Sequence, residues 1–350
     1  MAKFIDGQRP TIRQIAKRAK VSEATVCRAL NDHPHQSKAT KDRIKRIAEE
    51  IGYIKHPFVS ALMTEVRNRR SVNHSPVIAL VHCLPTEWFP IPNLSDLKEG
   101  AQQVALEQGY TVEEFFMKEE GMSPKRLISI LEARGIRGMI FEHMIQPDLT
   151  SQIDLRRFAC VTIEYLVHAP EFHKINTDQF GGMQIALKKA VEYGYRRVGF
   201  ISNTNREKLN AYRRKAAMLL SEDMAEEDVF FTSHETNFGN VGYEKEAAKW
   251  IRENRLDAVM SMRAKMPEEL QQAGLKIPAD LGFIHLDLSK KNQHNHSGID
   301  PNWHRVGSTA VKQVVGMLRR NEHGTQDEPL LTYVPAHWVD GQSLPARSKP

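Results

Sequence analysis

The chain has 350 residues, of which 41% are hydrophobic, and this length predicts two or three domains with sizeable cores. It contains no run near the roughly 20 apolar residues that a membrane span needs, and its polar start lacks the apolar segment of a secretory signal. The three cysteines, Cys27, Cys83 and Cys160, are too widely spaced for a disulfide framework or a metal site. These features predict a cytoplasmic protein without membrane contact.

The net charge of +6 is unevenly distributed along the chain. Residues 1–70 hold 16 Lys and Arg against 7 Asp and Glu, whereas the remainder holds 33 against 36. A basic segment joined to a slightly acidic remainder is typical of a phosphate-binding module attached to a domain with another role. The alternative is a solvated basic face that has no partner.

The first predicted elements are two short amphipathic helices within residues 10–31. Apolar residues mark the inward face of each helix: Ile12, Ile15, Ala16 and Ala19 in the first, and Val26, Ala29 and Leu30 in the second. Thr11 and Ser22 are the predicted N-caps, and only Lys20 and Val21 separate the helices. So tight a turn predicts a helix-turn-helix that presents Arg28 outward to a DNA major groove. An ordinary helical hairpin is the alternative.

A third helix and a shorter apolar segment follow. Ser37 or Thr40 is predicted to cap a helix over residues 38–51, which completes a small three-helix core. Beyond it, an apolar stripe occurs behind Pro57: Phe58, Val59, Leu62, Met63 and Val66. A helix of about ten residues is unstable alone in water, so this one is predicted to form only against a partner. A linker that packs on the neighbouring domain is the alternative.

From Pro76 onward, strands alternate with helices. Apolar runs predict strands at 77–83, 110–116, 137–142, 159–163, 197–202, 228–232, 257–262, 281–286 and 330–334. Helical patterns at about 94–108, 124–134, 178–193, 206–221, 239–254 and 303–320 separate most of them. The alternation predicts parallel sheets covered by helices on both faces. Because roughly 270 residues exceed one comfortable core, we expect two stacked α/β lobes.

The sequence gives little support for catalysis. It lacks Gly-x-Ser-x-Gly, His-Glu-x-x-His and a phosphate-cradling glycine loop. His294 and His296 stand close together, but without a nearby Cys, Asp or third His they favour a solvated loop over a metal site. We therefore expect no catalytic residues, no metal and no cofactor.

Residues 11–31 closely resemble the N-terminal signature of the lactose-repressor (LacI/GalR) family of bacterial transcription regulators. The pattern is T-I-x-x-I-A-x-x-A-x-V-S-x-x-T-V-x-R-x-L-N. The residues in register with it are Thr11, Ile15, Ala16, Ala19, Val21, Ser22, Thr25, Val26, Arg28, Leu30 and Asn31. One departure is Lys20, where the family usually has Gly.

This resemblance implies roles for individual residues of the basic segment. Five fall where the family contacts DNA phosphates: Thr11, Ser22, Thr25, Asn31 and Ser37. Glu23, Ala24 and Arg28 fall where it reads base edges, and a guanidinium matches O6 and N7 of guanine. The segment around Phe58 and Leu62 resembles the family's hinge helix, which folds on DNA and inserts the Leu into the minor groove.

Later blocks resemble the same family. Residues 175–201 contain its Asp and paired Gly residues, residues 274–287 match its G-L-x-V-P-x-D block, and residues 297–318 match its last segment. The implied fold is an all-α helix-turn-helix domain followed by a two-lobed α/β domain of the periplasmic-binding-protein-like (type I) class. Three chain crossings and a ligand cleft would join the lobes. The predicted domains are residues 1–56, a hinge and linker at 57–75, and residues 76–350.

In sugar-binding members of the family, an Arg and an Asp grip ligand hydroxyls. Asp287 matches the Asp position, although capping of a strand end is an equal alternative. Asn210 falls at the Arg position, with Arg206 and Arg213 nearby. Trp303 falls in the last cleft-lining loop, where it would stack on a sugar ring or belong to the core. The family's A-N-D-x-x-A block is absent, which predicts an unusual ligand or weak ligand control.

The sequence therefore predicts a transcription regulator, a repressor rather than an enzyme, that binds double-stranded operator DNA. A homodimer follows from recognition geometry, because one helix-turn-helix reads only a half-site. The predicted effector is a small sugar-like molecule in the interlobe cleft. The rival functions are a solute-binding receptor of the same fold, a ligand-independent DNA-binding regulator and a sugar-modifying enzyme. Activation instead of repression is also open, since the sign depends on operator position.

Overall fold

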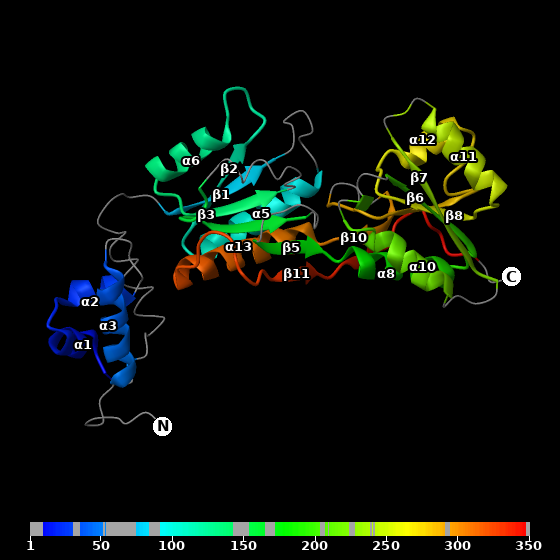
Figure 1. The fold of residues 1–350 in the computed structure, drawn as a ribbon. Coiled ribbons are helices and arrows are strands. Elements are labelled where there is room, and N and C mark those ends of the chain that lie inside the picture. The colour runs from blue at the N-terminus through cyan, green and yellow to red at the C-terminus, as the bar shows by residue number, and fades with distance from the viewer. Residues whose placement is uncertain are drawn as a thin grey trace. The chain divides into compact units, whose positions relative to one another are not determined.

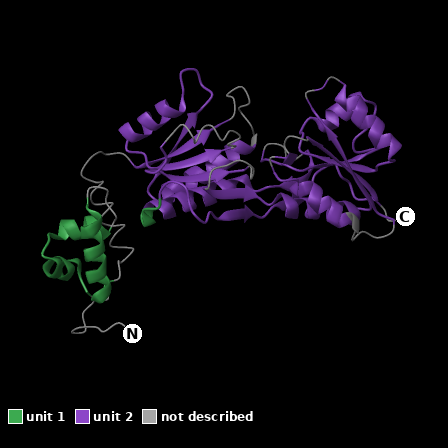
Figure 2. Cartoon of the chain, viewed as in Figure 1, with its two compact units in different colours: residues 1–74, 319–322 green, residues 75–318, 323–350 purple. Residues whose placement is uncertain are grey.

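The protein divides into two compact units in this computed structural model (Figure 2). Unit 1 comprises residues 1–74 and 319–322, and unit 2 comprises residues 75–318 and 323–350. The structure describes residues 10–30, 36–51, 53, 75–83, 92–142, 154–164, 172–203, 207–208, 210–223, 228–238, 240, 242–290 and 295–347. Asn31, the predicted hinge residues Phe58 and Leu62, Arg206 and His294 lie outside the described residues.

The described part of unit 1 has three short helices around one small core: α1 (Ile12–Ala19), α2 (Glu23–Leu30) and α3 (Lys38–Glu50). The buried residues are Ile15, Ala16, Ala19, Val26, Ala29, Ile44 and Ala48. Thr11 forms a capping box with Gln14, and Ser37 accepts a hydrogen bond from the Thr40 amide at 3.3 Å. The predicted caps and inward faces are confirmed, because they depend on contacts only a few residues apart.

The turn between α1 and α2 departs from the usual residue preference. Lys20 adopts φ +51° and ψ +49°, the left-handed conformation that glycine adopts without steric cost. The Val21 amide then bonds the Ala16 carbonyl at 3.0 Å, which closes the helix end. Lys20 therefore carries strain of roughly 1 kcal/mol at this position.

Unit 2 contains two six-stranded sheets (Figure 1). The order of the first is β11-β5-β4-β3-β1-β2. Its strands are β1 (Val77–His82), β2 (Thr111–Phe116), β3 (Gly138–Glu142), β4 (Ala159–Ile163), β5 (His173–Thr177) and β11 (Leu331–Val334). The order of the second is β12-β10-β9-β8-β6-β7. Its strands are β6 (Arg197–Asn203), β7 (Phe230–Thr236), β8 (Ala258–Ser261), β9 (Gly282–His285), β10 (Ser297–Asp300) and β12 (His337–Val339).

Helices cover both faces of each sheet, as the alternating pattern predicts. The first sheet carries α5 (Pro92–Glu107), α6 (Pro124–Ala133) and α13 (Trp303–Arg320). The second carries α8 (Gln179–Glu192), α10 (Arg213–Asp223), α11 (Tyr243–Glu253) and α12 (Met266–Gln272). Each sheet has one apolar cluster on each face. We call the sheets with their helices the first and the second lobe. Among the described residues, no helix is long and apolar enough to cross a membrane.

The chain passes between the lobes three times. The crossings lie at Asp178 between β5 and α8, at residues 301–302 between β10 and α13, and at residues 335–336 between β11 and β12. The two lobes and their three crossings therefore confirm the fold that the resemblance predicts.

Several elements differ from the predicted ones. The expectation of purely parallel sheets is wrong at one edge, because β12 pairs with β10 in the antiparallel sense. After the third crossing, β12 continues directly from β11 without a crossover helix, so it must enter the second sheet reversed. The helix predicted over residues 206–221 is interrupted: residues 207–208 are helical, Ala211 and Tyr212 have φ of +52° and +55°, and α10 begins at Arg213.

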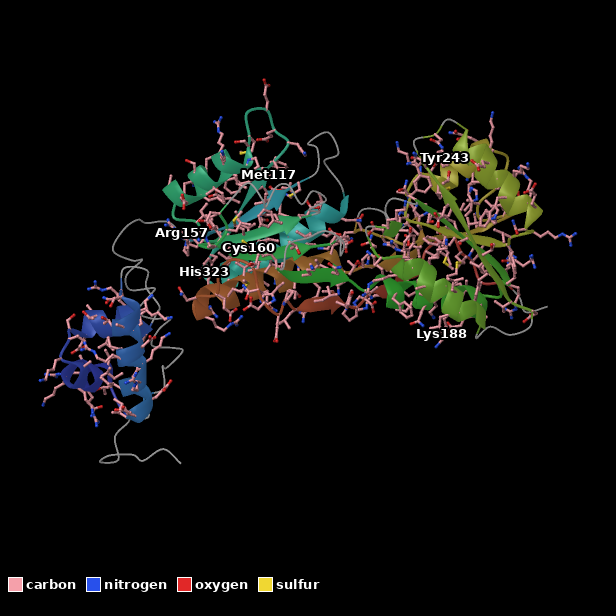
Figure 3. The ribbon with its side chains drawn as sticks, in the orientation of Figure 1. Met117, Arg157, Cys160, Lys188, Tyr243 and His323 are labelled. Atoms are coloured by element: carbon pink, nitrogen blue, oxygen red, sulfur yellow. The ribbon has the colours of Figure 1, made fainter. Side chains whose placement is uncertain are left out.

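Two of the three cysteines are buried core residues. Cys160 lies in β4 of the first lobe (Figure 3), and burial raises the pKa of its thiol well above the usual range. Burial likewise raises the pKa of Cys83 to about 12. Cys27 in α2 is half-buried, and all three are free thiols. Protonated, buried thiols of this kind are chemically inert.

Candidate DNA-binding surface and interlobe pocket

The outward face of α2 carries the three residues predicted to read bases. Glu23, Ala24 and Arg28 are exposed, whereas Val26 and Ala29 on the opposite face are fully buried. Arg28 donates from Nε to the Ala24 carbonyl at 3.3 Å, so its guanidinium lies along its own helix. A helix anchored on one side and polar on the other can enter a major groove without disturbing its core.

Hydroxyl residues stand at the beginning of all three helices of unit 1. Thr11 accepts from the Gln14 amide at 3.3 Å, Ser22 from the Thr25 amide at 3.1 Å, and Ser37 from the Thr40 amide. The Ser22 and Thr25 hydroxyls also bond each other at 2.9 Å. Helix N-termini bind anions through their free amides, so three of them in one small unit suit contacts to DNA phosphates.

Basic side chains surround these helix ends. Besides Arg28, seven exposed cations lie on α1, on α3 and in the turn between α1 and α2: Arg13, Lys17, Arg18, Lys20, Lys38, Arg43 and Arg46. Within the described part of the chain, none of the seven forms an ion pair with a carboxylate. Their charge is therefore available to a polyanion, and the counterions released on binding would make the affinity depend steeply on salt.

Unit 2 contains a pocket at the point where the three chain crossings meet. It encloses about 380 Å³, counted with the solvent at its mouth. Each crossing contributes lining residues: Thr177, Asp178 and Gln179 from the first, Pro301 and Trp303 from the second, and Ala336 from the third. We call this the interlobe pocket. Because its walls are the connections between the lobes, occupancy of the pocket and the relation of the lobes are mechanically linked.

One wall of the interlobe pocket is polar and acidic. Its charged residues are Glu164, Asp178, Arg214 and Asp287. Glu164 follows β4 with φ +61° and accepts hydrogen bonds from the Thr177 amide at 3.3 Å, the Thr177 hydroxyl at 2.8 Å and Gln179 Nε2 at 3.1 Å. Burial raises the pKa of Glu164, a shift opposed by the Thr177 hydrogen bonds and the Arg214 charge. The carboxyl is thus held in place but poorly solvated.

The guanidinium on this wall is already paired. Arg214 Nη1 lies 3.0 Å from Glu207 Oε1, and both side chains are buried. The loop before α10 positions the pair, since the Tyr212 amide bonds the Glu207 carbonyl at 2.8 Å. Arg214 therefore contributes little uncompensated positive charge to the pocket.

The rest of the lining is largely apolar. It includes Met183, Met262, Leu286, Ile299 and Trp303. Met262 and Arg263 stand in the stretch where the family's A-N-D-x-x-A block is missing. Arg263 packs against the rings of Phe238 and Tyr243, 5.3 Å from each ring centre, and bonds Glu269 at 2.5 Å and 2.7 Å. The Arg263 side chain thus stabilises the second lobe. At this place the pocket is lined by the thioether of Met262, whereas the family's block would supply the amide of its Asn and the carboxylate of its Asp.

The predicted ligand residues are only partly brought together. Asp287 and Trp303 both line the pocket, and Trp303 Nε1 donates to Asp287 Oδ1 at 2.9 Å. Trp303 also belongs to the core of the first lobe, as the core interpretation predicts, whereas stacking on a sugar ring stays a prediction. Asn210 is buried outside the lining, and Arg213 lies on the Tyr333 ring with 4.5 Å between guanidinium carbon and ring centre.

Sequence reasoning missed Glu164, Gln179 and Arg214. A usable signal existed for Glu164, because a carboxylate directly after a buried parallel strand lies at the sheet edge where ligands bind. Gln179 and Arg214 carried no such signal, since each lies within a helical pattern.

His296 differs from the solvated loop residue that its neighbourhood predicts. Its ring is half-buried and stacks on His285, with centroids 5.9 Å apart. Among the described residues, no group of three or more His, Cys, Asp or Glu side chains could hold a metal ion.

The fold and the two sites define a helix-turn-helix DNA-binding protein with a periplasmic-binding-protein-like domain. Residues 11–56 match the family model of bacterial regulatory proteins of the lacI family, and residues 187–344 match the model of a periplasmic binding protein-like domain. The chain thus contains a helix-turn-helix domain of the LacI family, as the signature in residues 11–31 predicts, and a periplasmic-binding-protein-like domain.

Known proteins resemble the chain over nearly its whole length. The HTH-type transcriptional repressor PurR of Aliivibrio salmonicida is 23% identical over 89% of this chain and 93% of its own. The solved complex of the transcriptional regulator CelR with cellobiose has a TM-score of 0.60 at 19% identity, covering 96% of this chain and all of that one. The lac repressor dimer bound to operator and an anti-inducer has a TM-score of 0.58 at 14% identity, covering 97% and 100%.

Proposed function

We propose that this protein is a cytoplasmic transcriptional repressor that binds a palindromic operator as a homodimer and has no catalytic activity. A small effector, a sugar or a related metabolite, would bind in the interlobe pocket and control operator affinity. The observation that carries the proposal is the outward face of α2. Glu23, Ala24 and Arg28 are exposed there above a buried core, and the seven other exposed cations of α1, α3 and the turn form no ion pair with a described carboxylate.

The position of the pocket supports control by a ligand. A molecule held at the three crossings contacts both lobes, so it would favour one arrangement of them over others. Two solved structures of similar fold support the same two roles, binding of a small ligand and binding of operator DNA. One is a regulator in complex with cellobiose, and another is a repressor dimer bound to its operator. A solute-binding receptor would have no use for the basic helix-turn-helix unit.

The direct test is selection of binding sites from random duplex DNA with the full-length protein at two salt concentrations. We expect an inverted repeat with a flexible central step, and an affinity that falls steeply with salt. Enrichment of no sequence, or of a single unpaired half-site, would contradict the homodimeric operator model.

A matched pair of variants sharpens this test. Arg28→Ala should relax specificity at one base pair and cost about 1–3 kcal/mol of specific binding, because it removes a bidentate base contact. Arg43→Ala removes a cation of α3 that has no predicted base contact, so it should weaken binding to all sequences alike. Equal loss of specificity in both variants would count against α2 as the reading helix.

A further inference from the structure

Glu164 is a buried carboxyl group at the wall of the interlobe pocket, and it has no counter-ion among the described residues. The residue is 6% exposed, and no cation of the described residues lies within ion-pair distance of its carboxylate. A charged group removed from water is costly unless a partner of opposite charge or a proton compensates it. The hydrogen bonds from Thr177 and Gln179 hold the group but supply no positive charge.

The other charges of the pocket do not fill this role. Arg214, the guanidinium that lines the pocket, is paired with Glu207 at 3.0 Å. Asp178 and Asp287 add negative charge to the same wall, and the Asp287 charge further raises the pKa of Glu164. The electrostatic field inside the pocket is therefore negative.

A second buried group points to a missing hydrogen-bond donor. Gln179 is 8% exposed, lines the pocket, and gives its Nε2 to Glu164. Its Oε1 atom has no hydrogen-bond partner among the described residues. Buried acceptors of this kind are normally satisfied, so a donor from outside the chain is expected here. A metal ion is a poor candidate, since the described residues provide no metal-binding cluster.

We propose that the effector carries a protonated amine, which the pocket holds between Glu164 and Gln179 Oε1 with Asp287 nearby. The apolar lining residues Met183, Met262 and Ile299 would contact the uncharged part of the molecule. This inference rests on the proposed function, because it names the chemical class of the effector that controls the repressor. The same field repels phosphate and carboxylate groups, so sugar phosphates and organic acids are excluded as effectors.

The proposal predicts a linked proton. An ammonium group beside Glu164 stabilises the carboxylate, so the pKa of Glu164 falls on binding and a proton is released. The titratable groups that face Glu164 are Asp287 from the loop after β9 and Arg214 from α10. Arg214 is a permanent cation, and Asp287 attracts the same ammonium group. Neither residue therefore reverses the direction in which amine binding depends on pH. For amines that stay protonated, binding should tighten as the pH rises, because fewer Glu164 carboxyl groups then carry a proton that the ammonium group must displace.

The test uses the full-length protein and sets of compounds that differ only in charge. Suitable sets are glucosamine, glucose and glucose 6-phosphate, the corresponding galactose compounds, and short primary amines paired with alcohols of equal length. Thermal unfolding identifies the stabilising members, and isothermal titration in two buffers measures affinity and proton release. We expect the amines alone to stabilise the protein, with at least about tenfold preference over their neutral counterparts.

Variants separate the carboxylate charge from its shape. Glu164→Gln should abolish both the amine preference and the proton release, whereas Glu164→Asp should keep a reduced preference. Glu113→Gln changes an exposed carboxyl on β2 outside the pocket and should keep the full preference. Operator binding by each variant shows that it is folded.

Three results would overturn the proposal: a neutral or phosphorylated member that binds more tightly than its amine, an amine preference that survives in Glu164→Gln, or a panel in which no compound stabilises the protein. None of these results would contradict the proposed repressor function. Operator selection tests that function separately, without a ligand.

Discussion

Lys20 is a non-glycine residue at a tight turn, and its backbone is strained there. Its left-handed backbone carries strain that glycine would not have. Lys20→Gly should therefore stabilise unit 1 by up to about 1 kcal/mol, reduced by the greater freedom of glycine in the unfolded chain. The measurement is hydrogen exchange of the α1 and α3 core amides in the full-length protein, which should slow.

A matched control for this substitution lies two residues earlier, inside α1. Arg18→Gly places glycine inside α1, where it should destabilise the helix by about 1 kcal/mol and speed the same exchange. Faster exchange in both variants would mean that Lys20 is not strained.

His285 makes the stability of unit 2 sensitive to acid. Burial, and next the neighbouring His296, lower the pKa of His285 to about 3, and its Nδ1 accepts the Asp287 amide at 3.0 Å. In the folded state the His285 ring therefore stays neutral at pH values where the ring of the unfolded chain binds a proton, below about pH 6.5. The contribution of the neutral His285 ring to the free energy of unfolding is fully present above that pH. It is lost as the pH falls toward 3, by at most about 1.4 kcal/mol per pH unit.

Urea unfolding between about pH 4 and pH 8 checks the effect. His285→Asn keeps an acceptor near the Nδ1 position but cannot be protonated in this range, so its stability should fall less steeply in acid. His337→Gln alters an exposed histidine and should keep the native slope. A slope in His285→Asn equal to that of the unaltered protein would show that another group controls acid unfolding.

At the scale of elements, the apolar segment after Pro57 carries its own prediction. If this hinge segment folds on DNA and Leu62 enters the minor groove, Leu62→Ala should weaken operator binding by about tenfold or more, because it removes the wedge that bends the duplex. Binding to random DNA should change little. Fluorescence anisotropy with an operator and a scrambled duplex measures both.

Leu219→Ala removes a comparable exposed leucine from α10 and serves as the control. Normal operator affinity in Leu62→Ala would leave the linker interpretation of residues 57–75 as the better one.

Elements defined by local contacts could be predicted from sequence, whereas those defined by distant partners could not. The helix-turn-helix followed from Thr11, Ser22 and the inward apolar residues, all within one or two turns. In contrast, β5, β10 and β12 were missed, because they are three to five residues long and contain polar residues. They become strands by joining sheets whose other members lie far away in the chain.

The candidate pocket shows the same limit. Asp287 and Trp303 could be named from motifs, but the wall of the pocket depends on Glu164, Gln179 and Arg214. These residues come from the end of β4, the start of α8 and α10, which meet only in the folded protein. No local sequence pattern predicts that Glu207 neutralises the charge of Arg214.

At the scale of the whole second unit, one surface contact joins the lobes away from the pocket. Lys290 follows β9 of the second lobe, and its Nζ lies 2.6 Å from Glu99 Oε2 on α5 of the first. Its backbone amide also donates to Asp96 at 3.2 Å. Exposed ion pairs contribute at most about 1 kcal/mol, so Lys290→Ala should speed local opening by no more than about fivefold.

Hydrogen exchange of α5 and of residues 286–290 is the measurement. Lys188→Ala, on the exposed side of α8, should leave both segments unchanged. Acceleration well beyond fivefold would show that the contact controls the whole relation of the lobes and not one surface.

The third chain crossing has a consequence for how the protein is made. β11 and β12 are separated by two residues, yet each completes the edge of a different sheet. Neither sheet can be finished until residues 331–339 have left the ribosome. A stop codon before residue 331 would therefore deprive both lobes of an edge strand at once, while the DNA-binding unit would be intact. Late truncations of this gene should yield fragments that still have a complete helix-turn-helix but contain two exposed sheet edges prone to aggregation.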